Sequence, residues 1–166
     1  GELRRILQGL GGQFLQAYPE MDRVVMVGVQ RRGVVLAHRL AAVVAAQCGI
    51  NPPVGALDIT LYRDDVLHRQ TQPVLRGTDI VFSIDQRNVL LVDDVLFTGR
   101  TARAALAALL DIGRPDKIEL LVLVDRDHRE LPIQADYVGK RVMVPRRRSI
   151  QVHLIEVDGE DEVILT

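Results

Sequence analysis

The fold is decided by one stretch of the sequence, Val89-Leu90-Leu91-Val92-Asp93-Asp94-Val95-Leu96-Phe97-Thr98-Gly99-Arg100-Thr101. Its first four residues are apolar and predict a strand buried on both faces, as inside a parallel sheet. The Ala/Leu-rich run that follows, 102–110, predicts a helix. Asp93 and Asp94 end the strand, at the edge where open α/β sheets bind ligands. The turn 98–101 offers hydroxyls and backbone N–H groups at a helix N-terminus, which suit a phosphate. The unit therefore predicts a site for a sugar phosphate.

Two simpler interpretations compete with this one. Receiver domains also contain a strand that ends in two aspartates, but there the strand lies near the N-terminus and no phosphate turn follows it. An isolated Asp-Asp before a loop is more often a helix cap or a solvated turn. The acidic pair, the turn and the helix together form a more specific pattern than either half alone.

Length and composition predict one globular domain, because the 166 residues are 48% hydrophobic. The net charge of −1 argues against a general nucleic-acid binder but allows a local basic face. No apolar run approaches the roughly 18 residues of a membrane span, and no signal peptide is visible. Cys48 has no cysteine to pair with, which favours a reducing compartment. Together these features predict a cytoplasmic protein with no membrane partner. The chain begins with Gly, which leaves open whether natural residues precede it.

Further strand and helix patterns predict an α/β fold with a doubly wound, mostly parallel sheet flanked by helices. A glycine-interrupted helix is expected over 2–18 and a second helix over 34–47. The remainder, 135–166, contains short β-like pieces, including 152–157, and predicts a small β extension over the active-site edge. The expected strands are 23–28, 54–62, 89–92 and 117–124, with a weaker one at 78–84.

Two loops have the composition of ligand-binding segments. Gly28 and Gly33 bracket a loop in which Arg31 and Arg32 supply fixed positive charge, and the flanking glycines allow close backbone approach to a ligand. The segment 63–77 is polar and long, which predicts a mobile loop that closes over the active site.

The stretch 89–101 resembles the signature of the type I phosphoribosyltransferases, which bind phosphoribosyl pyrophosphate (PRPP). A closer resemblance is to the bacterial PyrR family, pyrimidine-operon attenuators that are also uracil phosphoribosyltransferases. It covers nearly the whole chain. The segments that carry it are 58–65, 89–101, 122–126, and 128–133 followed by 135–140.

The resemblance implies the type I phosphoribosyltransferase fold, with the extension as a hood, and transfer of ribose 5-phosphate from PRPP to uracil, giving UMP and pyrophosphate with Mg²⁺. Asp93 and Asp94 would be catalytic, holding the ribose hydroxyls and offering carboxylates to the Mg²⁺ carried by PRPP. Arg63 or the loop after it would close on the pyrophosphate. PRPP or UMP would be bound by Gln30, Arg31, Arg32, Gly33, Val95, Leu96, Phe97, Thr98, Gly99, Arg100 and Thr101. Uracil would be bound by Arg126 and by the backbone near Val138 and Ile150.

The resemblance also implies UMP-promoted binding of the pyrimidine-operon leader RNA, which attenuates transcription, and a homodimer or higher homo-oligomer. The candidate RNA-binding residues are His128, Arg129, Lys140 and Arg146. The chain departs from the family where RNA contacts are expected, so we rank the transferase above the RNA regulator. The departures are Gln8 and Gly12 in place of Thr and His, Arg31 in place of Thr, Asp127 in place of Gly, Gln134 in place of Arg, and the segment 141–149.

Two alternatives remain open at the level of sequence. One is a non-catalytic, nucleotide-sensing RNA-binding regulator that uses the PRPP pocket only to sense UMP or PRPP. The other is a phosphoribosyltransferase for a different base, because base choice depends on the divergent C-terminal segment.

Overall fold

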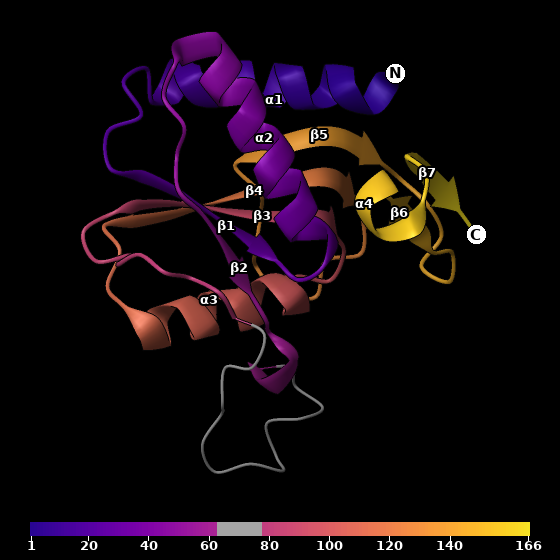
Figure 1. The fold of residues 1–166 in the computed structure, drawn as a ribbon. Helices are drawn as coiled ribbons and strands as arrows, with labels where there is room; N and C mark the ends of the chain where they lie inside the picture. Colours follow the sequence, from indigo (N-terminus) through magenta and orange to yellow (C-terminus); the bar gives the residue numbers. More distant parts are fainter. Residues whose placement is uncertain (63–77) are drawn as a thin grey trace.

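The computed structural model describes residues 1–62 and 78–166, and in it five parallel strands form the central sheet in the order β2-β1-β3-β4-β5 (Figure 1). This arrangement confirms the predicted α/β class with a parallel sheet. The segment 63–77, predicted as the mobile loop, and the candidate Arg63 lie outside the described residues. The strands are β1 (Val24–Val29), β2 (Val54–Leu57), β3 (Asn88–Leu96), β4 (Lys117–Arg126) and β5 (Tyr137–Val142).

Helices cover both faces of the sheet. Helices α1 (Glu2–Ala17) and α2 (Arg32–Cys48) lie on one face and α3 (Arg100–Ile112) on the other (Figure 1). Successive strand residues point to opposite faces, so Leu90 belongs to the core beneath α1 and α2, whereas Leu91 belongs to the core beneath α3. The near-continuous apolar strands follow from this burial on both sides.

Helix α1 runs unbroken through its three glycines. Gly11 is buried, and a Cβ placed on it would lie 2.7 Å from Cγ1 of Val43 in α2. Close packing of α1 on α2 therefore accounts for Gly11. The same packing compensates for the weak helical propensity of the glycines in α1.

Two predicted strands ahead of β3 differ from the structure, one in its end and one in its existence. The strand expected over 54–62 ends at Leu57, because the carboxylate of Asp58 accepts hydrogen bonds from the backbone N–H (2.9 Å) and the hydroxyl (2.6 Å) of Thr60 and starts the 3₁₀ turn η1 (Thr60–Tyr62). The strand expected over 78–84 is reduced to an isolated antiparallel bridge between Asp79 and Ala56.

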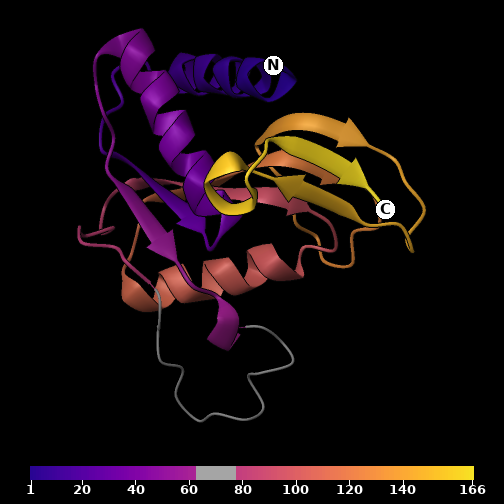
Figure 2. The same cartoon turned by 45° about the vertical axis from the view of Figure 1, so that its right-hand side comes forward.

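The C-terminal segment divides into two parts. Strand β5, which we predicted as part of the β extension, instead pairs with β4 as the edge of the main sheet. The rest forms an antiparallel hairpin with β6 (Ile150–His153), α4 (Ile155–Asp158) and β7 (Glu162–Leu165), located beyond the carboxyl ends of the strands (Figure 2). The strand expected over 152–157 becomes helical at Ile155, because Asp158 and Asp161 accept the N–H groups of Leu154 and Ile155, both at 2.8 Å. We call the segment 150–165 the C-terminal hairpin.

Among residues 1–62 and 78–166, no helix combines the length and the apolar character that crossing a membrane would require.

Candidate active site at the carboxyl ends of β1 and β3

The acidic pair lies within β3, which continues to Leu96 and does not end at Val92 as predicted. The carboxylate of Asp93 accepts the N–H of Asp94 at 2.8 Å, and that of Asp94 accepts the N–H of Val95 at 2.7 Å. Asp93 lies deep in the crevice, with part of its surface still reached by solvent. Burial raises the pKa of Asp93 well above its usual range, and the negative charge of Asp94 adds to the rise. A cation placed against this pair would reverse both effects, because it would stabilise the ionised forms.

The loop between β1 and α2 packs directly against the acidic pair. A Cβ on Gly33 would lie 2.5 Å from the carbonyl oxygen of Val92 and 3.2 Å from Cα of Asp93. A Cβ on Gly28 would lie 2.4 Å from the carbonyl oxygen of Gly33. Gly33 is therefore needed for backbone contact with β3, and Gly28 is needed for backbone contact with the start of α2. The predicted residues Gln30 and Arg31 are exposed and joined by a cis peptide bond, and Arg32 begins α2.

The predicted phosphate turn joins β3 to α3. Gly99 has φ +95°, in the left-handed region, and the N–H of Arg100 donates to Oγ1 of Thr98 at 3.2 Å. The turn leads directly into the N-terminus of α3, where backbone N–H groups can bind an anion. A cavity of about 100 Å³ lies here, lined by Asp93, Val95, Leu96, Phe97, Thr98, Gly99, Thr101, Ala102, Leu120 and Val122.

The segment 129–133 holds this turn in place by hydrogen bonds to its backbone carbonyl groups, which was not predicted from the sequence. Arg129 donates to the carbonyl oxygens of Phe97 (2.5 Å), Arg126 (3.2 Å) and Ile133 (2.8 Å), and also to the carboxylate of Asp125 (2.7 Å). The backbone of 130–131 donates to the carbonyl oxygen of Thr98 at 2.8 and 3.1 Å. Arg129, predicted to contact RNA, therefore uses its guanidinium inside the protein.

Arg126, predicted to bind uracil, is 3% exposed at the end of β4. Its guanidinium carbon lies 3.9 Å from the centre of the Phe97 ring, and it donates to the carbonyl oxygens of Arg148 (2.6 Å) and Pro145 (3.1 Å). Its Nε–H is buried and makes no hydrogen bond within the described residues. Arg126 thus connects Phe97, the residue before the turn, to the segment 141–149.

Val138 and Ile150, whose backbone was predicted to border uracil, have side chains in different parts of the core. Val138 packs into the core on the α3 side, whereas Ile150 packs into the core on the side of α1 and α2. Ile150 also lines a larger cavity, of about 480 Å³, together with Leu3, Ile6, Val142 and Leu165. This cavity is lined by neither the acidic pair nor the phosphate turn, so we assign the chemistry to the polar site at the strand ends.

The remaining candidate RNA-binding side chains have acidic or carbonyl partners. Nε2 of His128 lies 2.9 Å from the carbonyl oxygen of Val144 and 3.2 Å from a carboxylate oxygen of Asp127. Lys140 pairs with Glu2 at 3.4 Å. Arg146 and Arg100 both pair with Glu130, the latter at 2.9 Å, which lowers the pKa of Glu130.

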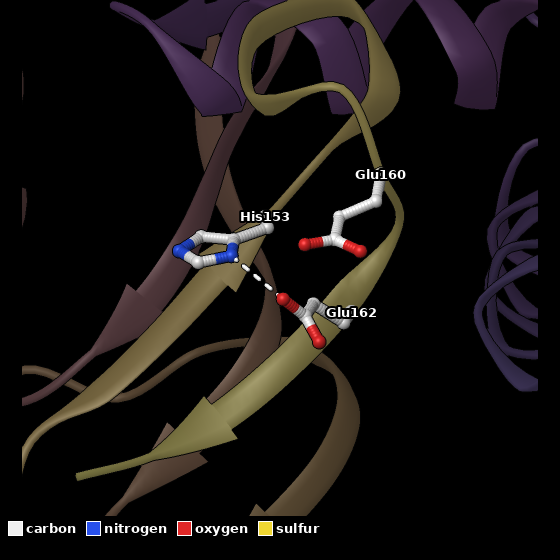
Figure 3. Close-up of side chains that lie close together, drawn as sticks. All are labelled: His153, Glu160 and Glu162. Carbon is white, nitrogen blue, oxygen red and sulfur yellow. Dashed lines mark hydrogen bonds and ion pairs between the residues drawn. The ribbon is translucent and has the colours of Figure 1, made fainter.

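A separate group of possible metal ligands lies on the C-terminal hairpin. His153, Glu160 and Glu162 point toward one another (Figure 3), with ligand atoms within 4.8 Å, and Nδ1 of His153 lies 3.1 Å from Glu162. Glu160 is exposed. A cross-strand His–Glu ion pair is sufficient to explain this arrangement.

Comparison with known proteins identifies the family. The model of the phosphoribosyl transferase domain matches residues 3–148. The protein named Bifunctional protein PyrR from Thermus aquaticus is 51% identical over 164 residues, which are 99% of this chain and 91% of the relative. The protein of the same name from Pelotomaculum thermopropionicum is 50% identical over 163 residues, covering 98% and 90%. The chain belongs to the PyrR family of phosphoribosyltransferases.

Solved structures agree with this membership at the level of the fold. The hypoxanthine phosphoribosyltransferase of Trypanosoma cruzi superposes on this PyrR-family chain with a TM-score of 0.74 at 16% identity, covering 99% of this chain and 91% of its own. The Staphylococcus aureus hypoxanthine phosphoribosyltransferase gives 0.68 at 24% identity, covering 88% and 75%. The predicted type I phosphoribosyltransferase fold is confirmed.

Proposed function

We propose that this chain is a uracil phosphoribosyltransferase that makes UMP and pyrophosphate from uracil and PRPP. The observation that carries the proposal is that three parts of the chain gather at the carboxyl ends of two neighbouring strands. The loop 28–33, the pair Asp93 and Asp94 and the turn 98–101 lie on the adjacent parallel strands β1 and β3, and Gly33 touches the backbone of Asp93. Their order matches the pyrophosphate, ribose and 5-phosphate of PRPP.

The acidic pair would supply the electrostatic part of the reaction. As the bond between the anomeric carbon and pyrophosphate breaks, positive charge develops on the sugar, and a ring nitrogen of uracil forms the new bond and loses its proton. Asp93 and Asp94 are fixed by backbone hydrogen bonds, so they would stabilise that charge without reorganising. Backbone N–H groups of the turn would hold the 5-phosphate, and Gln30, Arg31 and the loop backbone would hold the departing pyrophosphate.

The donor set also fits Mg²⁺, which prefers oxygen ligands and is usually bound by one or two carboxylates together with substrate phosphates. Asp93 and Asp94 would hold the ion with PRPP, and it would neutralise negative charge on the pyrophosphate. The raised pKa of Asp93 supports this assignment, because a bound cation offsets the cost of ionising a buried carboxyl group.

The choice of uracil rests on membership of the PyrR family, and the structure adds one supporting feature. Arg126 is held beside Phe97 by the carbonyl oxygens of Pro145 and Arg148. It would border the base opposite the phosphate turn. Its Nε–H is buried and has no hydrogen-bond acceptor among the described residues, so a bound base could supply one.

The test is nucleotide formation from PRPP and Mg²⁺ with each of several free bases. UMP from uracil alone is the expected result, and Asp93→Asn and Asp94→Asn should lose it, whereas Asp22→Asn, an exposed acid before β1, should retain it. Turnover of another base would keep the chemistry and overturn the choice of uracil. PRPP binding with no turnover of any base would overturn the enzyme and favour the nucleotide-sensing regulator.

A second proposed function is UMP-dependent binding of pyrimidine-operon leader RNA by a homo-oligomer of this chain. The favouring observation is 50% identity to relatives named bifunctional. His128, Lys140 and Arg146 are engaged with other residues of the chain, so RNA would have to compete for them. Filter retention of leader RNA with and without UMP tests the function, and equal retention in both conditions would contradict it.

A further inference from the structure

The C-terminal hairpin is attached to α2 by two arginines. Arg32, the first residue of α2, donates from Nη2 to Oδ1 of Asp158 at 2.7 Å and from Nε to Oδ2 at 3.2 Å. Arg39, further along the same helix, pairs with Glu156 and with Asp161, the latter at 2.9 and 2.8 Å. Only the first of these attachments reaches a residue of the loop 28–33.

Asp158 is itself fixed to the hairpin backbone. Its Oδ2 also accepts the N–H of Leu154 at 2.8 Å, and its side chain is 17% exposed. The hydrogen bonds from Arg32 and Leu154 lower the pKa of Asp158, and the bond to Asp158 raises the pKa of Arg32. Both groups are therefore charged at neutral pH, and a two-point contact between them has a defined geometry.

Arg32 belongs to the loop 28–33 and is adjacent in sequence to the glycine that contacts β3. It follows Arg31 and precedes Gly33, the residue in contact with Val92 and Asp93. Asp94 is near enough for its charge to contribute to the raised pKa of Arg32. Fixing the guanidinium of Arg32 therefore fixes the end of the loop that touches β3.

We propose that Asp158 is a positioning residue for pyrophosphate: through its two-point contact with Arg32 it holds the loop 30–33 in the shape that receives the pyrophosphate of PRPP. Asp158 therefore acts through Arg32 and does not itself contact the ligand. The inference rests on the proposed function only in that PRPP is the ligand of this loop. It assigns to the C-terminal hairpin a part in PRPP binding.

Asp158→Asn distinguishes positioning from a simple charge effect, because the two predict opposite changes in PRPP affinity. Removing a negative charge near a polyanion strengthens binding if charge alone matters. The same change strengthens binding if Asp158 merely competes with PRPP for Arg32. Loss of positioning weakens binding instead, because Asn is of equal size but cannot accept both hydrogen bonds from the guanidinium.

The experiment measures the dissociation constant of PRPP with Mg²⁺ by calorimetry, together with thermal unfolding and KM for PRPP and uracil. We expect Asp158→Asn to raise the dissociation constant of PRPP about tenfold, the usual effect of losing a charge-assisted hydrogen bond, and to leave KM for uracil within about twofold. Arg32→Lys keeps the charge but loses the two-point contact, so it should act in the same direction. Asp161→Asn is the matched control: it removes the same charge from the same hairpin and weakens the attachment at Arg39, and it should change PRPP affinity by less than about twofold.

Unchanged or tighter PRPP binding by Asp158→Asn overturns the inference, and so does an equal loss in Asp161→Asn, which would indicate general anchoring. If Asp158→Asn does not fold, Arg32→Lys decides by the same criterion. If the unmodified protein binds PRPP but does not convert uracil, the proposed function is overturned. The dissociation constants of the variants would still test the role of Asp158 in PRPP binding. Failure of the unmodified protein to bind PRPP would overturn both.

Discussion

Gly33→Ala tests whether contact between the loop 28–33 and β3 is required for catalysis. Gly33 is buried at the start of α2, and a Cβ added to it would lie 2.5 Å from the carbonyl oxygen of Val92. Cβ atoms essentially never approach other heavy atoms within 3.0 Å, so the gap must widen by at least about 0.5 Å. The neighbour is backbone, which cannot rotate away as a flexible side chain could. Either the loop or the strand that carries Asp93 has to move.

Two opposing terms set the expected size of the effect. Ala in a helix gains about 1 kcal/mol over Gly, while overpacking against fixed backbone costs about 1–3 kcal/mol. We therefore expect a net loss of up to about 2 kcal/mol in the free energy of unfolding. The effect on kcat/KM should be larger, between about tenfold and 100-fold, because a displacement approaching 1 Å in a catalytic constellation has a cost of that order.

The assay combines thermal unfolding with steady-state kinetics, and Gly9→Ala is the control. Gly9 lies in α1, and a Cβ there would meet no atom within 4 Å. The control should gain about 1 kcal/mol of stability, or about 2–4 °C in Tm, with unchanged kinetics. If Gly33→Ala also gains stability and keeps its kcat/KM, close backbone contact is not what places the loop, and the reasoning is refuted.

Three further predictions follow from the contacts described. Asp93→Asn should lower kcat by at least about 10²-fold and raise Tm at neutral pH. The pKa of Asp93 is higher in the folded protein than in the unfolded chain, so ionisation of this carboxyl group destabilises the fold once the pH exceeds the unfolded-state pKa. Asn cannot ionise and therefore removes this loss of stability. A lower Tm would contradict this. Arg129→Lys should raise KM for PRPP about tenfold, since Lys cannot bond the carbonyl oxygen of Phe97 and its other acceptors together; an unchanged KM would show that the turn needs no such support. Tyr62→Phe should lose about 1 kcal/mol with the 2.8 Å bond to Asp111. Burial and, second, this hydrogen bond raise the pKa of Tyr62 to about 12. The unfolded chain releases the proton from about pH 10, so the stability advantage of the unmodified protein over Tyr62→Phe should disappear between pH 10 and pH 12. Denaturation measured over this pH range tests the prediction.

The parts of the site that the sequence predicted are those built from neighbours along the chain. The strand, acidic pair, turn and helix of 89–112 follow from local hydrophobic pattern, glycine and helix propensity, and each was found in place. Parallel pairing of β1 with β3 then brings the loop 28–33 to the same edge, which the general rule for open α/β sheets anticipates. The local errors, at 54–62 and 152–157, involved aspartate side chains that capture backbone N–H groups and override strand propensity.

The parts that were missed depend on contacts between residues far apart in sequence. Arg32 and Asp158 are separated by 126 positions, and Arg129 bonds the carbonyl oxygen of Phe97 across 32. No periodicity or spacing in the chain encodes these pairs. Arg129 was accordingly assigned to RNA from its charge, whereas the structure places its donors on backbone carbonyls that hold the phosphate turn.

The departures from the family at Asp127 and 141–149 are structurally coupled through hydrogen bonds with the end of β4. The carboxylate of Asp127 accepts the N–H of Val144 at 3.1 Å, and His128 meets the carbonyl oxygen of the same residue. Arg126 binds two further carbonyl oxygens of this segment. The segment is thus held by backbone contacts from the end of β4, so its side chains can change without moving those contacts. Because β1, β3 and α3 make none of these bonds, side-chain changes on 141–149 are compatible with an unchanged acidic pair and turn 98–101, and Arg126 is the residue that links this segment to the proposed base site.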